Sequence, residues 1–125
     1  MRLNPDCIRD ILLATEGNTG YREELQLSRN EPLPEQLQKY DFKTVAYHVN
    51  QCIMADLLVE GHRFVGVEIS IGDLTPAGHE FLANIRADTN WNKVKQKAKA
   101  IGSESLSVLA QIAGQVISAM LTQPH

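Results

Sequence analysis

The sequence has little that would mark a specialised class of protein. Its 125 residues include two cysteines, Cys7 and Cys52, which are too few for a disulfide framework. Both fall on apolar helical patterns, so we expect reduced thiols in the core. No run reaches the roughly 18 uncharged apolar residues that suggest a membrane span. The first residues, MRLNPDC, also lack the apolar stretch of a signal peptide. We therefore expect a cytoplasmic protein with one domain's core and no contact with a membrane.

Basic charge and catalytic motifs are also lacking. The formal net charge is −3, so the overall composition does not point to nucleic acid. His48 and Cys52 are four residues apart and could meet on one side of a helix, but no HxxxH or paired CxxC accompanies them. Ser103, Ser105 and His79 lack any motif that links a nucleophile to a base. We therefore expect no enzymatic activity, no metal and no cofactor.

A strongly patterned stretch at residues 41–82 stands out from the rest of the chain. Asp41 is a good N-cap residue, and the apolar residues that follow it recur at three- and four-residue spacing. The pattern is broken by Glu60-Gly61, so it predicts one helix over residues 42–58. The buried face of that helix is expected to contain Phe42, Val45, Ala46, Val49, Cys52, Ile53 and Leu57.

Two short β-prone runs follow this helix, at residues 63–67 and 68–71. Thr75 and Pro76 then predict a helix start, with Thr75 as the cap and Pro76 in the first helical position. A recognition helix, a two-stranded wing and a closing helix in this order are typical of a winged helix-turn-helix. A strand at residues 23–27 would join the wing, and residues 35–40 are expected to form a short helix.

The flanking segments carry helix signals of their own. Residues 4–6, Asn-Pro-Asp, predict a helix start, and that helix should end near Gly17. Asp88 and Thr89 can cap another helix, which ends at Gly102 in the manner of a C′ glycine. We expect Ser103 to cap the last helix, at residues 104–121.

The predicted fold class is therefore α+β and mostly α: a winged helix-turn-helix with a small β-wing and extra C-terminal helices. The winged-helix domain should span residues 1–102. Residues 103–125 should form an apolar helix that packs on this domain or in a dimer interface.

Four ordered blocks of the sequence carry a family resemblance: LNPDCIRDILL, YHVNQCIMADLL, LTPAGHEFLANIR and DTNWNKVKQKA. Together they resemble the bacterial and bacteriophage domain-of-unknown-function family 2513, from Leu3 to about Leu121. The resemblance implies a fold and a phage or prophage setting but no mechanism. The central block also resembles the recognition helix of small bacterial winged-helix regulators. Those regulators usually have glycine in place of Asp56 and a basic residue in place of Tyr47.

The polar face of the central helix is the first candidate site. In a winged helix, such a face enters the major groove, where short polar side chains reach base edges and basic ones hold phosphates. The alternative is a solvated helix face, which the local charge favours because residues 33–66 hold three basic and four acidic side chains. The candidate nucleic-acid-binding residues are Lys43, Thr44, Tyr47, Asn50, Gln51 and, near the wing tip, Arg63.

A run of lysines is the second candidate. Lys93 and Lys97 share one helix face by their i, i+4 spacing, and Lys95 and Lys99 share another. These four residues could contact phosphate or an acidic partner, or they could be a solvated face whose stems cover apolar surface. Trp91 is interpreted as a packing anchor for this helix.

The uncharged last helix is the third candidate. Its apolar residues spread beyond one stripe, so it should be buried on more than one side. Packing across the domain core would achieve this, and so would pairing with a second copy. For the second case we expect a homodimer whose interface contains Leu109, Ile112, Val116 and Met120.

Two functions remain open from the sequence. The first is a winged-helix protein that binds double-stranded DNA as a phage or prophage transcription regulator. The second is a non-enzymatic interaction module of the same fold that binds a host or phage protein, since a fold does not fix a function. The polar helix face favours DNA, and the acidic balance favours a protein partner.

Overall fold

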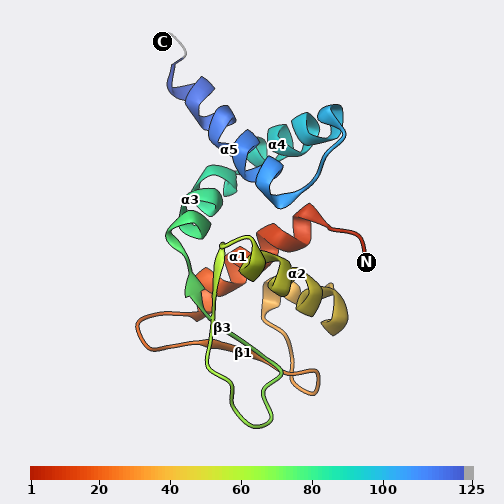
Figure 1. The fold of residues 1–125 in the computed structure, drawn as a ribbon, viewed down its shortest axis with the longest axis vertical. Coiled ribbons are helices and arrows are strands. Elements are labelled where there is room, and N and C mark those ends of the chain that lie inside the picture. The colour runs from red at the N-terminus through yellow and green to blue at the C-terminus, as the bar shows by residue number, and fades with distance from the viewer. Residues whose placement is uncertain (123–125) are drawn as a thin grey trace.

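The computed structural model describes residues 1–122, and the predicted α+β, mostly helical class is confirmed. The elements follow one another along the chain as shown in Figure 1. They are α1 (Pro5–Asn18), β1 (Leu25–Leu27), the 3-10 turn η1 (Glu35–Leu37), α2 (Phe42–Met54), β2 (Leu58–Glu60), β3 (Ile69–Leu74), α3 (Pro76–Ile85), α4 (Asp88–Ile101) and α5 (Leu106–Leu121).

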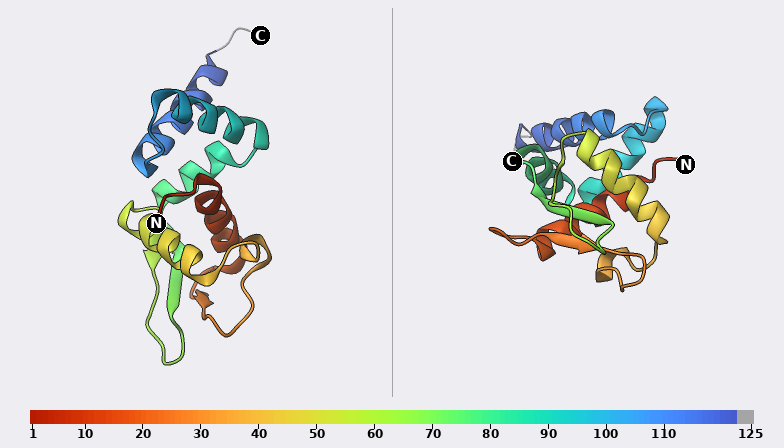
Figure 2. Two further views of the ribbon diagram at one scale, coloured as in Figure 1. Left: turned by 90° about the vertical axis from the view of Figure 1, so that its right-hand side faces the viewer. Right: turned by 60° about the horizontal axis from the view of Figure 1, so that its bottom comes forward.

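The three strands form one antiparallel sheet in the order β1-β3-β2. Leu25 pairs with Ile71 on one side of β3, and Leu58 pairs with Leu74 on the other. A bulge lies between Val59 and Glu60. The residues that join β2 to β3, at positions 61–68, form a loop that projects away from the helices in Figure 1 and in the left view of Figure 2.

Three predicted helix starts are confirmed by their caps. The Asn4 side chain accepts from the backbone N–H groups of Asp6 and Cys7. The Asp41 carboxylate accepts from the N–H of Thr44. Hydrogen bonding from the Thr44 side chain, and then from this N–H, lowers the pKa of Asp41. The Thr75 hydroxyl accepts from the N–H of Gly78. Each cap satisfies donors that the helix itself leaves without a partner.

The predicted end of the central helix was wrong: α2 stops at Met54 and not at residue 58. Asp56 adopts a left-handed conformation, with φ of 61°. The N–H of Leu57 then donates to the Cys52 carbonyl, which closes the helix C-terminus. Leu58 leaves the helical pattern and pairs with Leu74 in the sheet. A positive φ is the conformation that glycine adopts at no steric cost.

The predicted hairpin strands were also misplaced. Residues 63–67 lie in the β2–β3 loop, and β3 begins at Ile69 and runs to Leu74. Phe64 and Val65 have the β propensity of strand residues but are exposed, Phe64 by 51%. Propensity alone could not show that they have no strand to pair with.

The cap of the last helix lies two residues later than predicted. Gly102 adopts φ of 83°, as expected for C′ of α4. The N–H of Ser103 donates to the Ala98 carbonyl, so Ser103 completes the end of α4 and does not begin α5. Ser105 caps α5 by accepting from the N–H of Val108. The predicted capping of α4 by Asp88 and Thr89 was wrong as well, because the N-cap residue is Ala87.

Helix α1 lies at the centre of the core, in contact with η1, α2, α3 and β3. Ile8, Ile11 and Leu12 of this helix are fully buried. Cys7 and Cys52 are free and buried, as predicted, and burial raises the pKa of Cys7 to about 12 and that of Cys52 further. These thiols are therefore core side chains and are not nucleophiles at neutral pH.

Helix α5 packs against α3 and α4. Its residues Leu109, Ile112, Ala113 and Val116 are buried within the chain. Trp91 of α4 is 2% exposed, and its indole N–H donates to the Asp6 carboxylate at 2.8 Å, which confirms its role as a packing anchor. The C-terminal end of α5 extends beyond the other helices in Figure 1.

Candidate nucleic-acid interface

The outer face of α2 is polar, as the sequence predicted. Lys43 and Asn50 are exposed, and Thr44, Tyr47 and Gln51 are half-buried. The opposite face packs into the core through Val45, His48, Val49 and Cys52. Within residues 1–122, two side chains in or next to this helix form hydrogen bonds, those of Asp41 and His48. The polar groups of the outer face are therefore free to bind another molecule.

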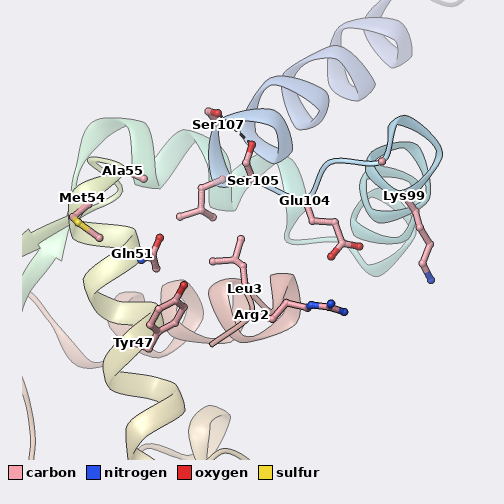
Figure 3. A pocket seen from close by; sticks show the side chains of 12 residues that line it. Arg2, Leu3, Tyr47, Gln51, Met54, Ala55, Lys99, Glu104, Ser105 and Ser107 are labelled. Atoms are coloured by element: carbon pink, nitrogen blue, oxygen red, sulfur yellow. Dashed lines mark hydrogen bonds between the residues drawn. The ribbon is translucent and has the colours of Figure 1, made fainter.

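A hollow of about 740 Å³ lies between α2 and the start of α5, and we refer to it as the α2–α5 hollow. Figure 3 shows the side chains of Tyr47 and Gln51 pointing into it from α2. Arg2 and Leu3 approach from the N-terminal segment. The lining residues are Arg2, Leu3, Tyr47, Gln51, Met54, Ala55, Lys99, Gly102, Glu104, Ser105, Leu106 and Ser107.

His48 fixes the N-terminal segment beside α2. Its side chain is 1% exposed. Its Nε2 accepts from the backbone N–H of Asn4 at 2.8 Å, while Nδ1 donates to the Thr44 carbonyl at 2.7 Å. Because both ring nitrogens are engaged inside the protein, His48 is a structural residue here and not a metal ligand.

A second, smaller hollow of about 340 Å³ lies between α2 and the β2–β3 loop. Ala46, Asn50 and Ile53 line it from the helix, and Arg63 lines it from the loop. The structure thus divides the predicted polar face: Asn50 shares one hollow with Arg63, and Tyr47 and Gln51 share the other with the N-terminal segment. The Arg63 side chain is 94% exposed, with Glu60 at 3.9 Å.

The β2–β3 loop is tied to the sheet by a cluster of polar groups that sequence reasoning missed. The Glu24 carboxylate accepts from the His62 ring, from the His62 backbone N–H at 2.9 Å and from the Ser70 hydroxyl at 2.7 Å. The bond from the His62 ring is the largest of the causes that lower the pKa of Glu24 to about 2. This cluster fixes the start of the loop that carries Arg63.

The lysines of α4 divide into two groups. Lys95 binds the Asp6 carboxylate at 2.9 Å and, together with Lys99, lines a shallow hollow beside the start of α1. Burial raises the pKa of Asp6, but the bonds from Lys95 and Trp91 outweigh this effect, and the pKa is lowered. Lys93 and Lys97 are exposed. Within residues 1–122, no acidic group lies within ion-pair distance of Lys93, Lys97 or Lys99.

The predicted dimer residues mostly lie in the core of the single chain. Leu109, Ile112 and Val116 are at most 4% exposed, because α3 and α4 cover them. Met120 is 42% exposed, and the neighbouring Leu121 is 78% exposed. The first three residues therefore offer no free apolar surface to a second copy, and the homodimer itself stays a prediction.

Residues 1–122 contain no group of three or more histidine, cysteine, aspartate or glutamate side chains that could hold a metal ion. None of the helices in this part of the chain is long and apolar enough to cross a membrane.

The elements define an α+β protein in which helices dominate and a three-stranded antiparallel sheet carries a long hairpin loop beside α2. The chain belongs to the family described as hypothetical protein (DUF2513), whose model matches residues 2–104. This match includes every element from α1 to α4 and ends just before α5.

A protein of Haemophilus influenzae, described as an uncharacterized protein, is 34% identical over 124 residues, which are 97% of this chain and 99% of the relative. No solved structure matches.

The lining of the α2–α5 hollow includes residues that sequence reasoning missed. Arg2 and Leu3 precede the first helix, and Glu104, Ser105 and Ser107 lie at the start of the last one. No local pattern relates these two segments. One signal in the sequence could have indicated this hollow, namely the i, i+4 pair of Lys95 and Lys99, because Lys99 lines the hollow.

Proposed function

We propose that this protein is a winged-helix protein that binds double-stranded DNA, with α2 as the recognition helix and the β2–β3 loop as the wing. The observation that carries the proposal is the outer face of α2. There, Lys43, Tyr47, Asn50 and Gln51 have polar groups without partners in residues 1–122, on a helix whose other face is fixed in the core. Amide side chains of this kind suit base edges in the major groove, and a lysine beside them suits a phosphate.

The arrangement of the elements supports the proposal. A helix, a strand, a short turn of helix, the recognition helix and a hairpin follow one another, and β3 lies between β1 and β2. This order resembles that of a winged helix-turn-helix, with the 3-10 turn η1 in the place of its second helix. Asn50 and Arg63 line one hollow, so the helix face and the loop could contact one duplex together.

The first experiment removes the two basic groups of this surface. Replacing Lys43 and Arg63 by alanine should weaken binding of a labelled mixed-sequence duplex by about tenfold. It should also reduce the dependence of log K on log salt by about 1.8, because each lost phosphate contact removes about 0.9. Fluorescence anisotropy between about 50 and 200 mM salt measures both quantities.

The control is the double variant of Lys93 and Lys97 to alanine, which removes the same charge from exposed positions on α4. It should bind like the unchanged protein. Equal effects of the two double variants would mean that only overall charge matters and would exclude this face as the contact surface.

A second candidate function rests on the apolar side chains of the β2–β3 loop. Phe64 is 51% exposed and Val65 is fully exposed, and two neighbouring apolar side chains of this kind suit a protein partner better than a phosphate backbone. If the unchanged protein does not bind duplex DNA at any salt concentration, the interaction module becomes the better proposal.

We also propose that the protein forms a homodimer through the end of α5, where Met120 is 42% and Leu121 is 78% exposed. Light scattering should give the mass of a dimer, and replacing both residues by glutamate should give a folded monomer, because the charges would oppose an apolar contact. Gln111 and Gln115, on the opposite face of α5, provide the matched control when both are changed to glutamate. A monomeric unchanged protein would contradict this prediction.

A further inference from the structure

We propose that one sugar-phosphate strand of the bound duplex lies in the α2–α5 hollow, where Arg2 and Lys99 contact its phosphates. This inference rests on the proposed function and adds to it the second group of phosphate contacts. The hollow is open and not an enclosed cavity, so it suits a strand that passes through better than a small ligand that must be surrounded.

The position of Arg2 is fixed by the fold although it lies near the start of the chain. Asn4 is held at three points, because its backbone N–H donates to His48 and its side chain caps α1 through Asp6 and Cys7. Leu3, which lies between Arg2 and Asn4 in the sequence, packs against the core. A cation two residues from this anchor loses less conformational freedom on binding than one in a free tail.

The charges at this end of the hollow favour an anion. Arg2 and Lys99 have no ion-pair partner within residues 1–122, whereas Lys95, one turn earlier on α4, is already paired with Asp6. Arg2, Lys99 and Glu104 all line the hollow, and Figure 3 shows them on its side away from α2, with the Lys99 side chain extending outward. Two cations and one carboxylate give this end a positive balance in a chain whose net charge is −3.

The rest of the lining matches the other parts of a nucleotide strand. Tyr47 and Gln51 supply a hydroxyl and an amide from α2 at one end. Leu3 and Leu106 provide apolar surface between the two ends, which suits the carbon face of a sugar. A strand in this position borders the groove that α2 enters, so phosphate contacts here would set the register of the helix on the bases.

The test compares two charge-matched double variants of the full chain. Arg2→Ala with Lys99→Ala should weaken binding of the mixed-sequence duplex by tenfold to a hundredfold and reduce the salt slope by about 1.8. Lys93→Ala with Lys97→Ala should leave both unchanged. Glu104→Gln should strengthen binding severalfold, because it removes the opposing charge. Circular dichroism and thermal melting show that each variant is folded, as expected for exposed positions.

The outcomes separate this inference from the proposed function. If the Lys43 and Arg63 variant loses affinity but the Arg2 and Lys99 variant behaves like the Lys93 and Lys97 control, the strand does not lie in the hollow and the inference is overturned. If the unchanged protein does not bind duplex DNA, the inference and the proposed function fail together. The strand position is supported if the Lys43 and Arg63 variant and the Arg2 and Lys99 variant both lose salt slope, the Lys93 and Lys97 control does not, and Glu104→Gln binds more tightly.

Discussion

Replacing Val49 by aspartate should abolish folding. Val49 is 2% exposed and lies on the face of α2 that packs into the core between Val45 and Cys52. A carboxylate without a partner costs several kcal/mol in such a position. The whole free energy of unfolding of a small domain is about 5–15 kcal/mol, and the substitution also leaves the volume of the valine poorly filled.

Asn50→Asp is the matched control, because it places the same new charge one residue further along the same helix on an exposed position. Helix propensity and the distance to the helix ends are nearly equal for the two variants, so burial is the main difference between them. Far-UV circular dichroism with urea unfolding should show a folded Asn50→Asp protein within about 0.5 kcal/mol of the unchanged one. A Val49→Asp protein that unfolds cooperatively near the normal midpoint would show that the core does not depend on α2.

Local hydrogen bonding is the part of this fold that can be predicted from the sequence. The caps at Asn4, Asp41 and Thr75 and the terminal Gly102 each satisfy backbone groups within a few residues, so their residue types mark helix ends directly. The period of the apolar residues gives the buried face of α2 for the same reason. The residues of α2 that fall outside this apolar pattern form the polar face, so the pattern also predicts the candidate site.

Boundaries that depend on distant partners cannot be predicted in this way. Leu57 and Leu58 continue a helical pattern as well as they begin a strand, and the pairing of Leu58 with Leu74 decides between the two. Residues 63–67 illustrate the converse, since strand propensity does not create a partner strand. Ser103 and Ser105 are both good caps, and the bond from Ser103 to Ala98 assigns the first to the end of α4.

The α2–α5 hollow could not be predicted because it depends on contacts far apart in the sequence. The bond between Asn4 and His48 spans 44 residues, and it holds the N-terminal segment that brings Arg2 into the lining of the hollow. The ion pairs also join residues far apart in the sequence, since Arg86 binds Glu16 and Arg9 binds Asp88. Fewer basic residues therefore remain for a partner than the sequence suggests. Packing against α3 and α4 buries most of the apolar residues of α5. From the sequence alone, these residues could equally have formed a dimer interface.

Replacing Gly78 by alanine should lower the free energy of unfolding by about 2–3 kcal/mol, because an added Cβ overlaps a backbone atom that cannot move freely. This Cβ would lie 2.1 Å from the carbonyl oxygen of Leu57. That oxygen accepts from the N–H of Thr75 at 3.1 Å, and the Thr75 hydroxyl is in turn bound to the Asp56 carbonyl. Relief of the overlap would therefore displace the contact between the start of α3 and the link from α2 to β2.

Gly114→Ala provides the opposite expectation at a second helical glycine. A Cβ at Gly114 in α5 has no atom within 4 Å, so alanine should raise the free energy of unfolding by about 0.5–1 kcal/mol through its better helix propensity. Thermal melting should place the two variants on opposite sides of the unchanged protein, with a shift of about 4 °C for each kcal/mol. If Gly78→Ala were also stabilising, the start of α3 could not lie against the Leu57 carbonyl, and the junction between the sheet and the C-terminal helices would need a different packing.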